Sequence, residues 1–249
     1  MHLFSGGIDS PVAAWLLMKR GVRLVYLHFY LAPGPQTVMN SKVSRLVKIL
    51  SAWGGKSTIV LVPFAEYQLA TSGVPEALEP SLFRRFMRMV AEQLAANFNA
   101  YAVSTGDSLS QAASQTMWNI AAIDSKSSLP TLRPLLTYDK EEIVSLAKRI
   151  GTYDVSLEEY KDCCAVVTRH PKTRARAYQV SEYAERLDFA SLGATSLTMA
   201  SLATYNPNSD QTRIIPLSEV LAQSNLTKAS KGDTQAPGLS SHSITERIG

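Results

Sequence analysis

The chain has few of the features that mark membrane-spanning, secreted or disulfide-stabilised proteins. No stretch of its 249 residues approaches the roughly 18–20 uninterrupted apolar residues of a membrane span. Only two cysteines occur, and because Cys163 and Cys164 are adjacent they cannot cross-link distant parts of the chain. The first residues do not resemble a signal peptide, since the SGG at 5–7 interrupts the apolar run almost at once. These absences predict a soluble, cytoplasmic protein without structural disulfides.

Charge of either sign is also modest. Lys and Arg total 25 against 21 Asp and Glu, which gives a formal net charge of +4. The excess of positive charge lies before residue 191, because residues 191–249 hold four basic and four acidic side chains. Such a chain permits an anionic partner without requiring one. One local cluster would suit RNA phosphates if it adjoined a nucleotide site, and it consists of Arg169, His170, Lys172, Arg174 and Arg176.

Short apolar segments alternate with longer amphipathic segments over the first 150 residues. Strands are predicted at Leu24–Phe29, Ser57–Val62 and Ala100–Ser104. Helical periodicity occurs in five segments, Pro11–Arg20, Val38–Trp53, Ser81–Asn97, Ser110–Ile123 and Lys140–Ile150. This alternation predicts parallel βαβ units and an α/β fold with a doubly wound, mostly parallel sheet.

The composition changes near residue 190, after a short predicted helix at about Arg176–Leu187. From Ser191 onward Ser, Thr, Asn and Gly are frequent, and Ile214–Gln223 is the one amphipathic candidate. Lys228–Gly249 has the composition of a flexible tail. The sequence therefore predicts a domain over residues 1–190 and a weakly structured, partly flexible extension over residues 191–249.

A glycine turn leads directly into a helix near the start of the chain. Leu3 and Phe4 end a predicted strand, the SGG at 5–7 allows a tight turn, and Ser10-Pro11 is typical of a helix start. Backbone N–H groups at such a start point outward, and the helix dipole favours an anion there. This arrangement predicts a phosphate site. The string is neither a Walker P-loop nor the dinucleotide GxGxxG, and for a bare SGG a purely structural turn is an equally good interpretation.

The complete string distinguishes these readings. Ser5–Ser10 reads SGGIDS and resembles the SGGxDS pyrophosphate loop of the PP-loop ATPases, adenine nucleotide alpha hydrolase-like proteins that adenylate a substrate. The longer run SGGIDSPVAAWLLMKRG is similar to one branch, the tRNA 4-thiouridine synthetases, which are also linked to thiamine thiazole synthesis. The resemblance implies that Asp9 positions the phosphates or Mg²⁺. It also implies that the pyrophosphate of ATP is bound by Ser5, Gly6, Gly7, Asp9 and Ser10.

Further matches to this branch extend to about residue 190. Ser104–Thr116 reads STGDSLSQAASQT, close to the family's TGxxLGQxxSQT, with Ser110 in place of the usual glycine. The resemblance implies that Gly106 and Gln115 contact ATP. The alternative is a capped helix that begins near Ser110 with solvated glutamines, which is the better interpretation of Gln111.

The resemblance also places the nucleotide at the ends of the first two strands. Leu3 and Phe4 end one strand, and His28 and Phe29 end the other. Core packing is a strong alternative for the three apolar residues, and a satisfied buried histidine is the alternative for His28, which is assigned a binding role only. Arg84 matches a basic ATP-contacting position, although a run of basic residues on a helix is usually a solvated face. No cluster of metal ligands is predicted.

The two cysteines lie in a segment that resembles the family's sulfur-transfer region. Tyr160–Thr173 reads YKDCCAVVTRHPKT. Counting forward from Gly151 favours Cys163 as the functional cysteine, and counting back from Pro171 favours Cys164. A free cysteine is usually a small hydrophobic residue, whereas nearby basic side chains favour the nucleophilic thiolate. Both cysteines are therefore catalytic candidates.

The resemblance implies an ATP- and Mg²⁺-dependent tRNA sulfurtransferase that adenylates uridine 8 and replaces its oxygen with sulfur. The sulfur would come from a cysteine desulfurase or another persulfide donor, and the same step would serve thiamine thiazole synthesis. The family's THUMP and rhodanese domains have no match in this chain, so the RNA-binding domain is expected to be supplied elsewhere or to be missing.

Two alternatives remain open. One is another PP-loop adenylating enzyme, such as a tRNA 2-thiouridylase, a lysidine synthetase or an amidating ligase; the other is a non-catalytic nucleotide-binding module.

Overall fold

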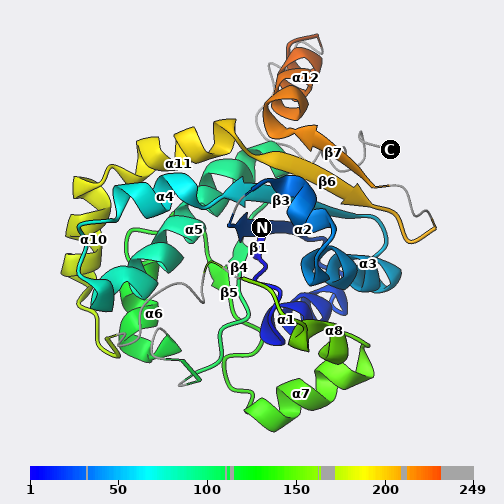
Figure 1. Cartoon of the computed structure of the whole chain (residues 1–249), viewed down its shortest axis with the longest axis horizontal. Coiled ribbons are helices and arrows are strands. Elements are labelled where there is room, and N and C mark those ends of the chain that lie inside the picture. Colours follow the sequence, from blue (N-terminus) through cyan, green and yellow to red (C-terminus); the bar gives the residue numbers. More distant parts are fainter. Residues whose placement is uncertain are drawn as a thin grey trace.

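A seven-stranded sheet with helices on both faces forms the centre of the molecule (Figure 1). The computed structural model describes residues 1–31, 33–109, 111–112, 115–161, 163, 172–208 and 212–230. The strand order is β5-β4-β1-β2-β3-β6-β7. The first five strands are parallel to one another, and β6 is antiparallel to both of its neighbours, β3 and β7. The predicted α/β, mostly parallel fold is confirmed. The strands are β1 (His2–Leu3), β2 (Val25–Tyr30), β3 (Ser57–Pro63), β4 (Val103–Ser104), β5 (Thr131–Leu132), β6 (Ser201–Tyr205) and β7 (Arg213–Pro216).

Most connections between strands are helical. In the described residues none of these helices is long and apolar enough to cross a bilayer. Two short 3-10 turns, η1 (Glu76–Leu78) and η2 (Ala96–Phe98), flank α5. The helices are α1 (Asp9–Met18), α2 (Pro35–Met39), α3 (Lys42–Gly54), α4 (Ala65–Ala70), α5 (Glu79–Ala95), α6 (Met117–Asp124), α7 (Lys140–Arg149), α8 (Tyr153–Leu157), α10 (Ala177–Arg186), α11 (Phe189–Thr198) and α12 (Leu217–Ser230).

Strand β2 supplies both hydrophobic cores, because successive side chains of a strand point to opposite faces of the sheet. Val25, Leu27 and Phe29 pack into the core that α5, α6, α10 and α11 cover. Tyr26 and Tyr30 pack into the core that α1, α3 and α7 cover. All six residues of β2 are buried, which explains why its sequence is a continuous apolar run rather than an alternating one.

Two predicted helices differ from the structure for a local reason. The segment predicted as one helix over 38–53 is divided into α2 and α3, because the side chain of Ser41 accepts a hydrogen bond from the N–H of Val43 and caps α3. The helix predicted from Ser110 begins only at Met117, with Thr116 as its N-cap. Ser110 itself lies outside the described residues. By contrast, the helix predicted over Lys140–Ile150 forms as α7, and Asp139 caps it in a complete capping box.

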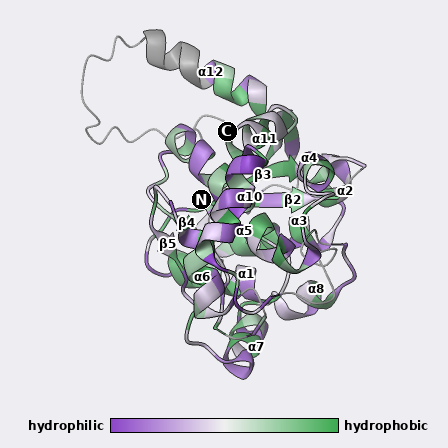
Figure 2. Ribbon diagram, turned by 90° about the vertical axis from the view of Figure 1, so that its left-hand side faces the viewer, coloured by the Kyte–Doolittle hydropathy of each residue, from purple (hydrophilic) through white to green (hydrophobic). Residues whose placement is uncertain are grey.

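The sheet continues beyond the predicted boundary at residue 190. Helix α11 crosses that position, and β6 then pairs antiparallel with β3 over five residue pairs from Ser57↔Tyr205 to Leu61↔Ser201. The described part of the extension therefore adds two strands to the sheet and a final helix. Figure 2 shows that α12 projects at the end of the molecule opposite to α7. The flexible tail was predicted to begin at Lys228, but residues 228–230 still belong to α12, and residues 231–249 lie outside the described residues.

Candidate functional site

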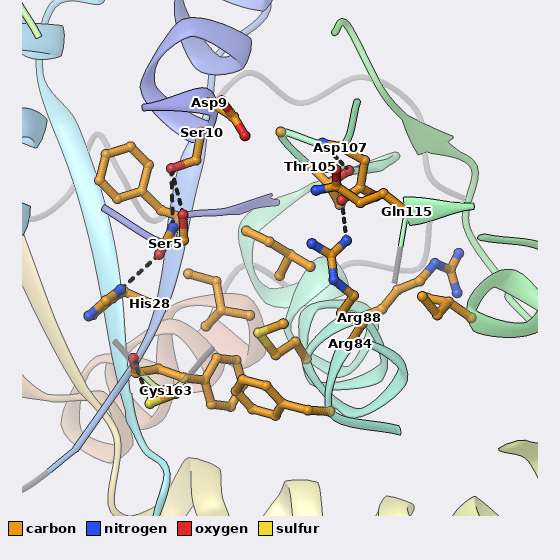
Figure 3. Close-up of a pocket in the computed structure, with 18 of the residues that line it drawn as sticks. Ser5, Asp9, Ser10, His28, Arg84, Arg88, Thr105, Asp107, Gln115 and Cys163 are labelled. Atoms are coloured by element: carbon orange, nitrogen blue, oxygen red, sulfur yellow. Dashed lines mark hydrogen bonds and ion pairs between the residues drawn. The ribbon is translucent and has the colours of Figure 1, made fainter. Parts of the chain in front are cut away.

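A cavity of about 210 Å³ lies at the carboxyl ends of β1, β2 and β4, the edge at which open α/β sheets bind ligands (Figure 3). Gly6 and Gly7 are not among its lining residues, and Cys164 lies outside the described residues. All other residues predicted from the sequence line it, namely Leu3, Phe4, Ser5, Asp9, Ser10, His28, Phe29, Arg84, Gly106, Gln115 and Cys163.

The SGGIDS segment forms one wall of the cavity. Gly6 has φ of +77°, a conformation that side-chain-bearing residues rarely adopt, and this lets the chain turn sharply before α1. Ser10 does not cap the helix as predicted, because the backbone is already helical at Ile8 and α1 begins at Asp9. The Ser10 hydroxyl instead accepts a hydrogen bond from the Ser5 N–H at 3.2 Å.

The start of α1 has the geometry of an anion site. No side chain caps the helix at its N-cap position, Ile8. The first N–H groups of any α-helix lack intrahelical partners, and together with the helix dipole they attract negative charge. Figure 3 shows Asp9 and Ser10 at this end of α1, above the strand ends. The phosphate site that the sequence predicts is therefore available as an uncapped helix start beside the cavity.

Gly106 brings the loop after β4 against the same helix start. A Cβ atom at this position would lie 2.8 Å from the backbone N of Ser10 and 3.0 Å from the carbonyl carbon of Asp9. Both are backbone atoms that cannot move aside without displacing α1. A glycine is thus required here for close packing, in addition to any contact with a ligand.

The opposite wall is an ion-pair cluster centred on Asp107. This buried carboxylate pairs with Arg84 of α5 and accepts from Nε of Arg133 at 3.0 Å. Arg133 also holds Asp124 through two 2.8 Å bonds. Burial alone would raise the pKa of Asp107, but the two guanidinium groups lower it below its ordinary value. Gln115 extends the cluster, since its amide nitrogen donates to the Ser108 carbonyl and its oxygen accepts from Arg84.

Sequence reasoning assigned no site role to Asp107 or Arg133, and both line the cavity. A signal for Asp107 existed, because it follows β4 by three residues at the ligand-binding edge of the sheet. Arg88 is also not on a solvated face. It is 3% exposed and donates to Thr131 Oγ1 at 2.9 Å and to the Leu129 carbonyl at 2.6 Å. Of the arginines on α5, the sequence favoured Arg84 for the site, and Arg84 does line the cavity.

Asp9 faces the ion-pair cluster across the cavity. Burial raises the pKa of its carboxyl group, and the negative charge of Asp107 raises it further. The positive charges of Arg84 and Lys140 act in the opposite direction, without cancelling the shift. A cation or an additional hydrogen-bond donor in the cavity would stabilise the ionised form of Asp9.

His28 and Cys163 lie at the lower side of the cavity in Figure 3. His28 Nδ1 lies 2.7 Å from the Phe4 carbonyl and Nε2 lies 2.8 Å from the Tyr160 hydroxyl. Since a carbonyl only accepts, Nδ1 carries a proton and donates it to the Phe4 carbonyl. This satisfied histidine fits a supporting role. Cys163 is 1% exposed, and its Sγ donates to the Phe29 carbonyl at 3.2 Å.

A second buried histidine, which the sequence did not indicate, supports the wall formed by the SGGIDS segment, residues 5–10. We refer to this wall as the phosphate-loop wall. His2 Nε2 lies 3.0 Å from the Ser10 carbonyl, and Nδ1 lies 2.8 Å from the Ser104 hydroxyl. Burial lowers the pKa of His2 to about 4, so the ring is neutral near pH 7. It thereby connects the first turn of α1 to β4 without adding charge.

Comparison with known proteins places this fold and cavity in a family. Residues 1–189 match the family model described as Thiamine biosynthesis protein (ThiI). The chain therefore belongs to the ThiI family. This confirms the resemblance carried by the SGGIDS loop.

Two curated relatives in this family carry the name "Probable tRNA sulfurtransferase". The chain is 40% identical over 210 residues to the protein of Moorella thermoacetica, an alignment covering 84% of this chain and 54% of the relative. It is 42% identical over 192 residues to that of Brevibacillus brevis, covering 76% and 48%. The chain thus spans about half the length of these relatives.

A solved structure has the same architecture. It is the crystal structure of a 4-thiouridine synthetase in complex with RNA and with bound ATP. The TM-score is 0.75 at 32% sequence identity, and the match covers 82% of this chain and 55% of the other.

Proposed function

We propose that this member of the ThiI family is an ATP-dependent tRNA sulfurtransferase that converts uridine 8 of tRNA to 4-thiouridine. The similar tRNA sulfurtransferases and the ATP- and RNA-bound 4-thiouridine synthetase support this proposal. One observation carries it: the uncapped helix start of α1 and the buried Cys163 line a single cavity, so phosphoryl transfer and sulfur chemistry can share one site. We assign this activity to residues 1–190, and thiamine thiazole synthesis would draw on the same sulfur-transfer step.

Adenylation is the first proposed step. The backbone N–H groups at the start of α1 bind the phosphates of ATP, and the apolar side chains of Leu3, Phe4 and Phe29 support the adenine. Arg84 and Gln115 contact the nucleotide from the opposite wall. The uridine O4 attacks the α-phosphorus, a P–O bond to the β-phosphate breaks, and pyrophosphate leaves. The cluster around Asp107 keeps Arg84 in place during this charge redistribution.

The cavity fits a magnesium ion held chiefly by substrate. Bound Mg²⁺ would neutralise the phosphate charge that develops during adenylation. Among the described residues no group of three or more His, Cys, Asp or Glu side chains could hold a metal ion. Magnesium bound through one or two carboxylates plus substrate phosphates needs no such group. Asp9 is the cavity carboxylate that fits, because a cation favours ionisation of a group whose pKa burial has raised.

Sulfur transfer is the second proposed step. A cysteine desulfurase or another persulfide donor supplies the sulfur. The terminal persulfide sulfur attacks C4 of the adenylated uridine, the C4–O bond breaks, and AMP leaves. The base is then joined to the carrier cysteine through an S–S bond, and a second cysteine thiolate attacks the carrier sulfur, so that this bond breaks, 4-thiouridine leaves and the two cysteines form a disulfide that a thiol reductant must reduce. Cys163 or Cys164 carries the persulfide or supplies the attacking thiolate. The buried position of Cys163 in the cavity supports its access to the adenylated base and limits its access to bulk oxidants.

The test is incubation of the chain with ATP, Mg²⁺, an unmodified tRNA transcript and a cysteine desulfurase with cysteine. Pyrophosphate release is measured directly, and the tRNA nucleosides are identified by mass spectrometry. We expect pyrophosphate release that depends on tRNA, together with 4-thiouridine at position 8. The reaction is run at low salt, where RNA affinity is greatest.

The products separate the alternatives. 2-Thiouridine in place of 4-thiouridine would assign the chain to the 2-thiouridylases, and lysidine or an amidated product would assign it to another adenylating branch. Nucleotide binding without pyrophosphate release, at any tRNA concentration tested, would assign it to the non-catalytic modules. Each of these results contradicts the proposal.

A further inference from the structure

An exposed aromatic and basic surface lies beside the cavity. Trp118 on α6 is 58% exposed, and the Arg174 guanidinium lies over its ring at 4.0 Å from the centroid. Tyr178 on α10 is 59% exposed, and Arg176 donates to its hydroxyl at 3.4 Å. Helices α6 and α10 pack side by side (Figure 1), so these two pairs occupy neighbouring positions. We refer to Trp118, Arg174, Arg176 and Tyr178 as the stacking surface.

Burial does not explain this surface. A tryptophan with more than half its area in water gains little from the protein core, and large exposed aromatic side chains beside basic residues are typical of nucleic-acid contacts. Arg174 in turn presents a planar cation that extends the Trp118 ring. Both an aromatic ring and a guanidinium plane stack on an unpaired base.

The surface is held rigidly. The Thr116 hydroxyl donates to the Thr173 carbonyl at 2.6 Å. The buried Asn119 amide donates to the Lys172 carbonyl at 2.8 Å and accepts from the Ala175 N–H at 2.7 Å. These three bonds fasten the strip that carries Arg174 to the first turn of α6, which carries Trp118. A pre-formed platform of this kind avoids the entropic cost of ordering its side chains upon binding.

The charge of the surface favours a polyanion. Residues 172–181 hold Lys172, Arg174 and Arg176 and no acidic residue, and residues 115–123 of the neighbouring segment hold no charged residue. Lys172, Arg174 and Arg176 are all exposed. The phosphates of a bound strand would therefore meet positive charge while its bases meet the aromatic rings.

The position of the surface links it to the site. Gln115 lines the cavity and Trp118 follows three residues later, so their Cα atoms are within about 11 Å of each other. Ile123, further along α6, lines the cavity too. A nucleotide stacked on Trp118 would thus be close to the nucleotide that enters the cavity.

From this arrangement we infer that an unpaired nucleotide of the RNA substrate stacks on the Trp118–Arg174 pair, with its backbone held by Lys172 and Arg176. The inference rests on the proposed function, since it identifies how that substrate is held next to the cavity. Stacking on this pair fixes an unpaired strand and orients the neighbouring uridine toward the start of α1.

The test measures affinity for a fluorescein-labelled tRNA transcript and for a short unpaired oligouridine, each over a range of salt concentrations. Trp118→Ala is compared with Trp53→Ala, because Trp53 is similarly exposed (54%) but lies at the C-terminal end of α3, which covers the opposite face of the sheet from α6. We expect Trp118→Ala to weaken binding of both RNAs about 5- to 100-fold with an unchanged salt slope, because stacking releases no counterions. Trp53→Ala should match the wild type.

Arginine variants supply a second, independent signature. Arg176→Ala should lower the slope of log K against log salt by about 0.7, the value for one lost phosphate contact on a single strand. Arg174→Lys should retain the slope and still weaken binding, because an ammonium group does not stack as a guanidinium plane does. ATP affinity without RNA, measured for each variant, reports whether the fold is intact.

Cross-linking of a photoreactive uridine oligonucleotide to the wild type needs no substitution and should label the peptide that contains Trp118. Equal RNA affinity of Trp118→Ala and wild type, or a cross-link map without that peptide, would overturn the stacking surface alone. A wild type that binds ATP but neither RNA would overturn the tRNA substrate of the proposed function as well.

Discussion

The two walls of the cavity are built in different ways. The phosphate-loop wall comes from one continuous segment, residues 5–10, and presents backbone N–H groups at a helix start. The ion-pair wall comes from three separate segments, which contribute Arg84, Asp107 and Arg133. The first wall can attract an anion through fixed dipoles. The second carries two arginines whose charge Asp107 partly neutralises.

This difference assigns a separate task to each wall. Dipoles of backbone N–H groups need no counterion, so the phosphate-loop wall is ready for phosphates before any ligand arrives. The ion-pair wall is stabilised by its own carboxylate and keeps Arg84 in a defined place beside the nucleotide site. Under the proposed function, we expect ATP affinity to depend mainly on the phosphate-loop wall and the placement of Arg84 to depend on the ion-pair wall. The following predictions test this division, in order of decreasing effect.

Asp9 is the acidic side chain of the phosphate-loop wall. We expect Asp9→Asn to reduce tRNA-dependent pyrophosphate release by about 100-fold or more, the usual cost of removing one group that stabilises transition-state charge. The thermal midpoint should fall little, because the carboxylate is partly buried beside another acid and its removal relieves repulsion. Pyrophosphate release is followed by a coupled phosphate assay. Equal rates for variant and wild type would remove Asp9 from the mechanism.

Asp107 is the centre of the ion-pair wall. Asp107→Asn should destabilise the fold by about 3 kcal/mol, the low end for breaking a buried ion pair, because the buried Arg133 loses one charged partner and keeps only Asp124. Chemical denaturation measures the change, with the exposed Asp154→Asn on α8 as the matched control. A variant as stable as the control would show that Asp107 is not needed to hold this wall together.

His2 connects the first turn of α1 to β4, behind the phosphate-loop wall. The pKa of His2 is about 4 in the folded protein, against 6.5 for an ordinary histidine in the unfolded chain, so mainly the unfolded chain gains a proton as the pH falls between these values. Stability should be complete above pH 6.5 and should decrease by about 3 kcal/mol as the pH falls to 4. His2→Gln should lack this component. Parallel pH curves of unfolding free energy for wild type and variant would contradict it.

Gly106 joins the walls by packing against α1. Gly106→Ala should destabilise the protein by about 1–3 kcal/mol and weaken ATP binding, because the added Cβ would push the start of α1 outward. Gly73→Ala is the control, since its Cβ would meet nothing within 4 Å. Calorimetry measures both quantities. If the two alanine variants behaved alike, the close packing at Gly106 would have no energetic role.

The same division explains how much could be predicted from the sequence. The phosphate-loop wall is local, so Ser5, Asp9, Ser10 and the residues at the ends of the first two strands line the cavity as the sequence predicts, although Gly6 and Gly7 do not. The ion-pair wall depends on contacts between distant segments, and the buried partners of a basic residue such as Arg88 are not visible in the sequence of its own helix. Sequence patterns describe one element at a time, whereas pairing of buried charges is a tertiary property.

Short elements were missed for a related reason. Strand β5 comprises two residues, too few for any periodic signal, and is defined only by pairing with β4. Strand β6 lies in a region rich in Ser and Thr and is stabilised by its pairing with β3. By contrast, β2 and β3 are mostly apolar and buried on both faces. The predicted bounds of β2 differ from the structure by one residue at both ends, and those of β3 by one residue at the C-terminal end. Burial on both faces makes a strand predictable from its own sequence. A strand that is defined chiefly by pairing with a neighbouring strand is not.

The central claim is that one cavity performs two separable reactions, and a Cys163→Ser/Cys164→Ser variant tests it most directly. The variant, ATP, tRNA and a cysteine-desulfurase persulfide are incubated together, and pyrophosphate and 4-thiouridine are measured in the same sample. The phosphate-loop wall needs no thiol, whereas displacement of AMP needs a sulfur nucleophile. We predict pyrophosphate release at the wild-type rate and no 4-thiouridine. Normal 4-thiouridine formation by this variant would contradict the account.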